Sequence, residues 1–321
     1  MTLQELRYLV ALADTGYVVR AAQACHVGQP TLSTQLRKLE DYLGVTLFER
    51  HKHHLVPTPV GEKIIERARA ALAVVEQIRD LAREDSDPLD GPLRLGVIPT
   101  LGPYLVPHLL PALRRRAAEL RLFLREDLTA NLLERLRQCR LDAALLALPV
   151  ADGDLEVLEL FHEPFVVALP QDNPLVGKTC IRAEDLDTEN LLLLEEGHCL
   201  RDHALALCGG ACAAGRDELK ATSLETLRQM VAAGVGCTLL PALAAQPRVG
   251  TVPGGLVQCR PFAAPGAVRR IGLVWRRHYP REQTALGIAD VILANLPAVV
   301  APCRPPRATP RLPPIHRLTP A

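Results

Sequence analysis

The sequence predicts an α/β protein with an all-α N-terminal domain, a long linker helix and a two-lobed α/β domain. Three patterns support this prediction: leucines at helical spacing near the start, a long heptad pattern after them, and apolar strands alternating with helices from residue 93. The chain has 321 residues, of which 48% are hydrophobic, so it can form more than one core. Because only 3% of the residues are aromatic, these cores must be rich in Leu, Val and Ala.

The N-terminal segment is expected to contain a helix-turn-helix. Thr2 and Glu5 form a capping box for a first helix that Gly16 ends. A short Ala-rich helix over residues 20–25 and a tight turn lead to a third helix over residues 29–43, which carries leucines at 4-3-4 spacing. Two short helices joined by a turn are typical of helix-turn-helix domains, although a solvated amphipathic helix has the same pattern.

A long helix is predicted to follow from Thr58-Pro59 to about Asp85. Its apolar residues follow a heptad rhythm, namely Ile64, Ala68, Ala71, Val75, Ile78 and Ala82. This stripe fits either a helix packed on its own domain or a dimerisation helix. The polar and Pro/Gly-containing residues 85–92 then read as a linker.

The sequence pattern of the rest of the chain is typical of an α/β domain. Buried strands are predicted at 93–98, 141–148, 165–170, 191–194, 238–241 and 269–275. Their alternation with helices predicts parallel sheets arranged in two lobes with crossing connections. Residues 302–321 contain seven prolines and four arginines without an acidic residue, so this tail is expected to be disordered.

Composition also bounds the cell compartment and the partners. Nine irregularly spaced cysteines do not form the even set of a small secreted disulfide protein. Because Met1 leads directly into a polar-patterned helix and no apolar run reaches transmembrane length, we expect a cytoplasmic protein without a membrane partner. The net charge of +1 by itself does not indicate nucleic-acid binding.

Two cysteines flank a predicted helix in an unusual setting. Cys199 lies beside His198 and near Arg201, and cationic neighbours lower the pKa of a thiol. Cys208 follows nine positions later, which in a helix corresponds to about 13.5 Å of rise and about 900° of rotation. A disulfide requires Cα atoms within roughly 7 Å, so these thiols can pair only if the segment is remodelled. The arrangement fits a redox switch, and two ordinary cysteines of a helical region are the alternative.

Several motifs in the first 50 residues resemble the winged helix-turn-helix of LysR-type transcriptional regulators. They are Ala21-Ala22, the run from Val27 to Ser33, Gln35-Leu36, Leu39-Glu40, Leu43-Gly44 and Leu47-Phe48-Glu49-Arg50. Gly28 departs from the pattern, because the family usually has serine there, and glycine supplies no capping side chain. The resemblance implies a DNA-binding domain over 1–60, a dimerising linker helix over 61–90, a periplasmic-binding-protein-like effector domain over 91–298 and a tail over 299–321.

Other motifs resemble the peroxide-sensing members of that family. They are Gly96 to Tyr104, Gly197 to Asp202 with Cys208, Ala221 to Leu227 and Met230 to Gly234. This resemblance implies that Cys199 is the thiol that reacts with peroxide and that Cys208 resolves it as a disulfide. It also implies a pocket for peroxide, formed by Thr100, Thr129, His198 and Arg269.

The resemblance further implies a transcriptional activator of antioxidant genes rather than an enzyme. Its expected partners are a double-stranded DNA operator, RNA polymerase and three further copies of the chain in a homotetramer, with hydrogen peroxide as the signal and no cofactor. We expect the DNA contacts to come from Gln29, Pro30, Thr31, Thr34, Arg37, Arg50 and Lys52.

Three alternatives remain open at this point. The chain could be a metabolite-sensing regulator of the same family, with an anionic effector at the helix start that Thr222 and Glu225 would cap. It could also be a cysteine peroxidase, although no second catalytic motif accompanies the thiols. A metal site that includes Cys199, Cys208 and Cys212 matches no standard ligand spacing, so none is predicted there; Cys212 could instead compete as a resolving thiol.

Overall fold

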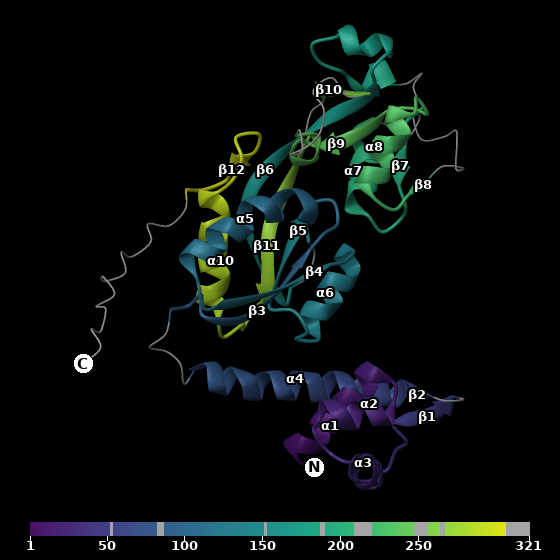
Figure 1. The fold of residues 1–321 in the computed structure, drawn as a ribbon, viewed down its shortest axis with the longest axis vertical. Coiled ribbons are helices and arrows are strands. Elements are labelled where there is room, and N and C mark those ends of the chain that lie inside the picture. The colour runs from purple at the N-terminus through teal and green to yellow at the C-terminus, as the bar shows by residue number, and fades with distance from the viewer. Residues whose placement is uncertain are drawn as a thin grey trace, which may run out of the picture.

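The computed structural model describes residues 1–51, 54–81, 87–150, 153–186, 190–208, 220–246, 256–263 and 267–305. A small N-terminal domain and a long helix lie beneath a larger, elongated regulatory domain (Figure 1). The elements of the N-terminal part are α1 (Leu3–Thr15), α2 (Val18–Ala24), α3 (Gln29–Leu43), β1 (Phe48–His51), β2 (His54–Pro57) and α4 (Pro59–Leu81).

The N-terminal domain confirms the predicted helix-turn-helix and its wing. Thr2 and Glu5 form the expected capping box, and Gly16 ends α1 with a φ of 70°. Strands β1 and β2 pair antiparallel as a β-hairpin wing. Of the leucines of α3, Leu32 and Leu39 are fully buried in a core shared with α1, α2 and α4, because the 4-3-4 spacing keeps them on one face.

The regulatory domain is built on a mixed sheet rather than on the parallel sheets that the alternation of elements suggests. The strand order is β10-β6-β11-β5-β3-β4, with β9 and β12 also paired to β6. Only the β3–β4 and β3–β5 pairs of this sheet are parallel. Its strands are β3 (Gly91–Val97), β4 (Leu120–Glu126), β5 (Ala143–Leu148), β6 (Leu155–Pro170), β9 (Thr238–Pro241), β10 (Val257–Pro261), β11 (Val268–Arg276) and β12 (Ala301–Pro302).

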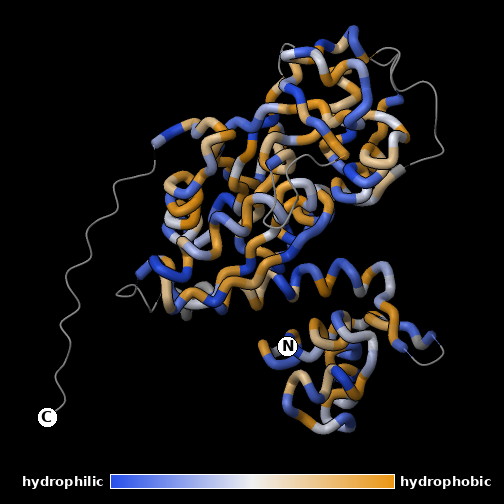
Figure 2. Tube along the Cα trace, turned by 45° about the horizontal axis from the view of Figure 1, so that its top comes forward, coloured by the Kyte–Doolittle hydropathy of each residue, from blue (hydrophilic) through white to orange (hydrophobic). Residues whose placement is uncertain are grey.

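Strand β6 crosses from one lobe to the other. Its first half pairs with β11 in the first lobe, and its second half pairs with β9 and β10 in the second (Figure 1). The hydropathy trace shows apolar residues concentrated inside both lobes and, separately, inside the N-terminal domain (Figure 2). Their buried residues form one core that continues through both lobes and a second core in the N-terminal domain.

Helices cover the sheet and complete the second lobe. They are α5 (Gly102–Arg116), α6 (Thr129–Arg137), α7 (Cys199–Cys208), α8 (Leu224–Ala232), α9 (Ala242–Ala245) and α10 (Glu282–Ala294), with the 3₁₀ turns η1 (Pro174–Gly177) and η2 (Ala183–Leu186). A short parallel pair, β7 (Leu193–Leu194) and β8 (Lys220–Ala221), lies beside α7 and α8. Within the described residues, no helix combines the length and the hydropathy that a membrane span requires.

The start of the expected disordered tail is ordered instead. Ala301 and Pro302 pair with His162 and Phe161 of β6, and the Cys303 amide donates to the Leu160 carbonyl at 2.8 Å. Val300 is buried beside them. The proline-rich composition did not indicate this ordered start. The order comes from pairing with the edge of β6, which involves only a few residues and is not visible in the composition. The remaining part, 306–321, lies outside the described residues.

Candidate functional site

Cys199 is the first residue of α7, at the place where the second lobe meets the first. Gly197 has a φ of 92°, which is a left-handed conformation that favours glycine. A Cβ at Gly197 would lie 3.0 Å from Cδ1 of Leu128. Leu128 is the N-cap residue of α6, and Thr129 is the first residue of that helix. The turn into α7 therefore brings Cys199 against the start of α6.

Arg269 joins the two lobes at this site through a fully buried network. Its Nη1 donates to Thr100 Oγ1 at 2.9 Å, and its Nη2 donates to the Thr100 carbonyl at 3.0 Å. Its Nε donates to Glu163 Oε2 at 2.8 Å. The other oxygen of Glu163 accepts from the Leu243 amide at 2.9 Å. The guanidinium therefore holds the loop after β3 against β6 and β11, with its charge matched inside the protein.

The hydroxyl of Thr129 lies at the thiol of Cys199. A hydrogen bond from Thr129 favours the thiolate form of Cys199 and lowers its pKa. The Thr129 Oγ1 atom is buried and has no partner of full hydrogen-bond geometry among the described residues. This hydroxyl therefore faces the thiol and is placed to contact a small oxygen-containing molecule bound there.

The pKa of Cys199 is nevertheless raised above that of an ordinary thiol. Burial is the largest cause, and Arg269 and Thr129 oppose it without cancelling it. The expectation that cationic neighbours depress this pKa is therefore wrong for this state of the protein. The charge of Arg269 is neutralised by Glu163, whose side chain is 0% exposed. Burial also lowers the pKa of His198, so the imidazole is neutral near pH 7.

Arg201, the other sequence neighbour that suggested a lowered pKa for Cys199, makes its hydrogen bond to a backbone carbonyl. Arg201 donates to the carbonyl of Leu194 on β7 at 3.1 Å. Its guanidinium thus ties the first turn of α7 to the second lobe.

Sequence reasoning missed two residues of the site. Glu163 is a fully buried acid that directly precedes the apolar run from 164 to 170, and that position was the available signal. His203 lies one helical turn after Cys199; burial and then Arg269 lower its pKa. Its Nδ1 is buried without a hydrogen-bond partner among the described residues, and its ring packs against Phe165 at a centroid distance of 6.2 Å. The spacing of four residues from Cys199 could have indicated it.

Cys208 ends the same helix and is buried, and neither Cys199 nor Cys208 is in a disulfide. The predicted helix between them is confirmed, so about nine helical steps separate the two thiols. Joining them requires α7 to unfold or rearrange. Cys212, the expected competitor, lies outside the described residues.

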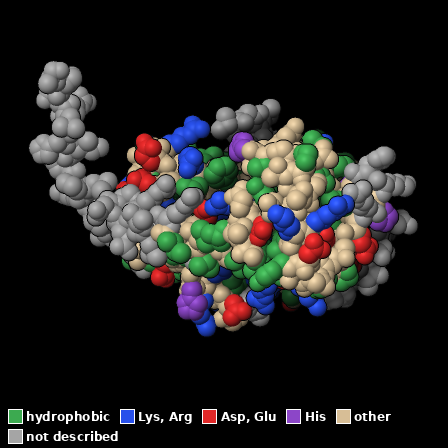
Figure 3. All heavy atoms as spheres, turned by 90° about the horizontal axis from the view of Figure 1, so that it is seen from below, with side chains coloured by type: hydrophobic (Ala, Val, Ile, Leu, Met, Phe, Trp, Pro, Cys, Tyr) green, Lys and Arg blue, Asp and Glu red, His purple; other side chains and the backbone are tan. Residues whose placement is uncertain are grey.

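The predicted DNA-contacting residues of α3 share one exposed surface. The exposed residues are Gln29, Pro30, Thr31, Thr34 and Arg37. Gly28 is the N-cap of α3 and makes no side-chain hydrogen bond, as the departure from the family pattern implies. The side chain of Arg50, on β1, and the whole of Lys52 lie outside the described residues. Seen from below, Lys and Arg side chains lie among Asp, Glu and hydrophobic groups (Figure 3).

The heptad stripe of α4 serves two environments. Ala68 is buried, and Ile64 and Ala71 pack against the N-terminal core. Further along the stripe, Val75 is partly buried and Ile78 is 63% exposed; Val74, which lies outside the stripe, is 53% exposed. The first half of α4 therefore packs on its own domain, and the second half presents an apolar surface.

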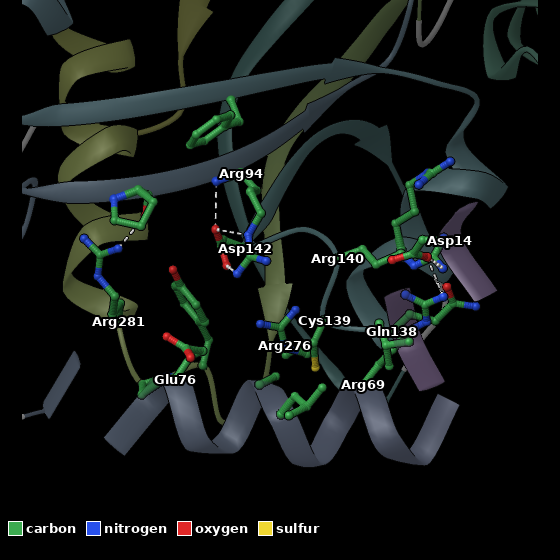
Figure 4. A pocket seen from close by; sticks show the side chains of 18 residues that line it. Asp14, Arg69, Glu76, Arg94, Gln138, Cys139, Arg140, Asp142, Arg276 and Arg281 are labelled. Atoms are coloured by element: carbon green, nitrogen blue, oxygen red, sulfur yellow. Dashed lines mark hydrogen bonds and ion pairs between the residues drawn. The ribbon is translucent and has the colours of Figure 1, made fainter. Parts of the chain in front are cut away.

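A pocket between α4 and the first lobe contains an ion-pair link between the two parts of the chain. Asp14 of α1 accepts from Arg69 of α4 at 2.7 Å and from Arg140, which follows α6, at 2.8 Å (Figure 4). Arg94, Arg276 and several further arginines also line this pocket. Asp14 thus connects the DNA-binding domain directly to the lobe that carries Thr129.

The helix start that suggested an anionic effector is capped differently from the prediction. Ser223, not Thr222, is the N-cap of α8 and accepts from the Thr226 amide at 3.1 Å. The helix begins one residue later than expected, so Glu225 occupies the second position of the first turn instead of the third. Glu225 then cannot complete a capping box, which needs the acid at the third position.

Two family models together match most of the chain. The model of the bacterial regulatory helix-turn-helix protein of the lysR family matches residues 3–62, and the LysR substrate binding domain matches residues 86–297. The chain belongs to the LysR family of transcriptional regulators. It is 43% identical over 299 residues to the DNA-binding transcriptional dual regulator OxyR of Escherichia coli K12, covering 92% of this chain and 96% of that protein.

Two solved structures are similar over nearly the whole chain. The full-length OxyR of Pseudomonas aeruginosa, in a cysteine-to-aspartate variant, has a TM-score of 0.79 and 42% identity, covering 92% of this chain and 99% of its own. A cysteine-to-serine mutant of OxyR from Corynebacterium glutamicum with bound H₂O₂ has a TM-score of 0.62 and 34% identity, covering 92% of each chain. The similarity includes both the DNA-binding and the regulatory parts.

Proposed function

We propose that this regulator senses hydrogen peroxide and that a reversible Cys199–Cys208 disulfide changes how it binds DNA. The observation that carries the proposal is a thiol at the start of α7, near the buried Arg269–Thr100 pair and the buried Thr129 hydroxyl. Its similarity to OxyR proteins, one of them with bound H₂O₂, supports the same function. Cys199 matches the sensing cysteine of OxyR.

The residues of the site support a two-step thiol reaction. The sulfur of Cys199 attacks one oxygen of H₂O₂, the O–O bond breaks, and the leaving hydroxide takes a proton to become water. Thr129 and Thr100 supply hydroxyls to that leaving group, and Arg269 stabilises the negative charge that develops. The Cys208 sulfur then displaces water from the sulfenic acid and forms the disulfide. Two thiols are oxidised, and one peroxide is reduced to two waters.

Burial raises the pKa of Cys199, so the thiol is mostly protonated at neutral pH before it reacts. A protonated thiol reacts slowly with general electrophiles, because the thiolate is the nucleophile. The hydroxide that leaves from peroxide, held by the hydroxyls and Arg269, takes up the thiol proton, so deprotonation accompanies attack. We therefore assign a signalling role rather than enzymatic turnover, with the disulfide persisting until a separate reductant reverses it.

The assembly that we propose is a cytoplasmic homotetramer on double-stranded DNA, with RNA polymerase as a further partner. Its exposed α3 surface would enter the major groove, with the β1–β2 wing beside it. The exposed Val74 and Ile78 on α4 supply an apolar surface for a second copy. Static light scattering of the full chain should give the tetramer mass at micromolar concentration, and a monomer only would contradict the assembly.

The disulfide itself is tested by thiol mapping. Full-length protein is treated briefly with peroxide, quenched with an alkylating reagent, digested and analysed by mass spectrometry. We expect a dominant peptide pair that joins Cys199 to Cys208. A Cys199 that remains reduced, or a dominant Cys208–Cys212 bond, would contradict the proposal. Cys199→Ser is the matched control and should protect Cys208 from rapid oxidation.

A further inference from the structure

A second cluster of chemically active side chains lies on β6 away from the redox site. It consists of Glu159, His162 and Cys303, whose candidate ligand atoms all lie within 4.8 Å of one another. His162 Nε2 is 2.6 Å from Glu159 Oε1, and the Cys303 thiol is 3.6 Å from the same oxygen. The three residues are partly or fully exposed to solvent. Nothing in the peroxide mechanism uses them.

A β-bulge brings the first two residues onto one face. In a regular strand, residues three positions apart point to opposite faces. The register between β6 and β11 shifts here, because Ile271 lies opposite Phe161 whereas Gly272 lies opposite Glu159. Leu160 is therefore the extra residue, and Glu159 and His162 share a side of the sheet. Bulges of this kind re-aim side chains and are frequent at functional sites.

The ordered start of the C-terminal segment supplies the third residue. Strand β12 pairs with β6 at His162, and the Cys303 amide donates to the Leu160 carbonyl at 2.8 Å. The backbone of Cys303 is therefore fixed beside the bulge. Cys303 is 144 positions from Glu159 in sequence. The β12–β6 pairing and the hydrogen bond of the Cys303 amide bring the two side chains together.

We propose that Glu159, His162 and Cys303 form a zinc-type divalent-metal site with three protein ligands and one open position. Carboxylate oxygen, imidazole nitrogen and thiolate sulfur are all ordinary zinc ligands, whereas Mg²⁺ and Ca²⁺ require oxygen donors. Zinc bonds of about 2.0–2.3 Å in a tetrahedron place ligand atoms about 3.3–3.7 Å apart. The Cys303–Glu159 separation of 3.6 Å lies in this range, the His162–Glu159 separation of 2.6 Å is shorter, and all three atoms lie within 4.8 Å, so small side-chain rotations produce the geometry.

The surroundings of the cluster also suit a metal ligand set. Arg270 donates to the second oxygen of Glu159 at 3.3 Å, which leaves Oε1 as a monodentate ligand whose orientation is fixed. On binding, the metal displaces the proton of the Cys303 thiol and breaks the direct Glu159–His162 hydrogen bond. The bound ion would fasten the C-terminal segment to the bulge in β6.

The test is metal binding to the full-length, reduced and metal-free protein, with Zn²⁺ and Co²⁺ as probes. Both Cys199 and Cys208 are replaced by serine in every sample, so that the redox thiols cannot bind the ion. Equilibrium dialysis should give one Zn²⁺ per chain, and Co²⁺ should produce a thiolate-to-metal charge-transfer band. Cys303→Ser should abolish the band, and His162→Gln should weaken Zn²⁺ binding by at least about tenfold.

The matched control is Cys259→Ser, which removes a partly buried thiol outside the cluster and should retain both signals. All three side chains are at the surface, so the variants are expected to fold. Equal Zn²⁺ binding by the parent and by Cys303→Ser, or Co²⁺ binding without the charge-transfer band, would overturn the proposal. In the chain with Cys199 and Cys208 intact, Cys303→Ser should still form the peroxide-induced disulfide, which separates this site from the redox switch.

Discussion

Glu163 balances the charge of Arg269, which lies near Cys199. Its carboxylate accepts from Arg269 at 2.8 Å, and both side chains are 0% exposed. A guanidinium without this partner would lower the pKa of a nearby thiol strongly. With the partner in place, burial dominates and the pKa of Cys199 is raised. The reduced sensor therefore keeps its thiol mostly protonated at neutral pH.

This charge balance predicts the pH dependence of Cys199 alkylation. Because the pKa of Cys199 is raised in the folded state, its thiolate fraction and its rate of reaction with iodoacetamide should keep rising beyond pH 8.5, about the pKa of a free thiol. In the urea-unfolded chain the same peptide should reach its plateau at lower pH. Mass spectrometry of the peptide measures both rates. A folded-state plateau below pH 8 would contradict the assigned direction.

Removing the counter-charge should change stability and reactivity together. We expect Glu163→Gln to lower the free energy of unfolding by about 3–5 kcal/mol, because it leaves Arg269 buried without a counter-ion. The remaining positive charge should also lower the pKa of Cys199, so alkylation at pH 7 should be faster. Urea unfolding and the alkylation rate are measured on the same samples. Slower alkylation would show that Glu163 does not act through Arg269.

Individual residues were predictable only where a motif contained them. Cys199, Thr100 and Arg269 came from the resemblance, and the structure brings them together, although no measurement yet tests their roles. Glu163 was not found, because its partner Arg269 lies 106 positions away and only the β6–β11 pairing unites them. The predicted pKa direction of Cys199 was wrong because burial of the thiol outweighs the lowering effects of Arg269 and Thr129.

The redox mechanism depends on a single element, helix α7. Cys199 and Cys208 are the first and last of its ten residues, so the disulfide and the intact helix exclude one another. Amide hydrogen exchange should therefore show strong protection across 200–207 in the reduced protein and loss of that protection after peroxide treatment. Cys208→Ser treated with peroxide should keep the protection. Equal exchange in the reduced and disulfide forms would show that the thiols join without remodelling α7.

Regular elements with a clear period were predicted well. The leucine spacing of α3 and the heptad spacing of α4 predicted these helices, because one face of α3 and the first half of the α4 stripe are buried. Strand β6 was recognised only from 165 onward, because the bulge at Leu160 interrupts the alternation in its first half. The cap of α8 was misplaced by one residue, because Thr222 and Ser223 are both good caps and only the fold selects between them.

At the scale of the whole molecule, the redox site and the DNA-binding domain both contact the first lobe. Thr129 begins α6, and Arg140 shortly after this helix contacts Asp14 of α1 at 2.8 Å. The presence of a helix-turn-helix and of a regulatory domain could be predicted from motifs. This contact could not, because Asp14 and Arg140 are 126 positions apart and both lie at the protein surface. Remodelling of α7 has a short physical path through α6 to the DNA-binding helices.

The measurement that tests the central claim most directly is a DNase footprint on a LysR-type operator with reduced and peroxide-treated full-length protein. A disulfide between Cys199 and Cys208 should change the length or phasing of the footprint, because rearranged lobes respace recognition helices that enter major grooves about 10–10.5 base pairs apart. Cys199→Ser should give the reduced pattern with and without peroxide. Identical footprints for the reduced protein and the disulfide form would contradict the account, even where mass spectrometry shows that the disulfide formed.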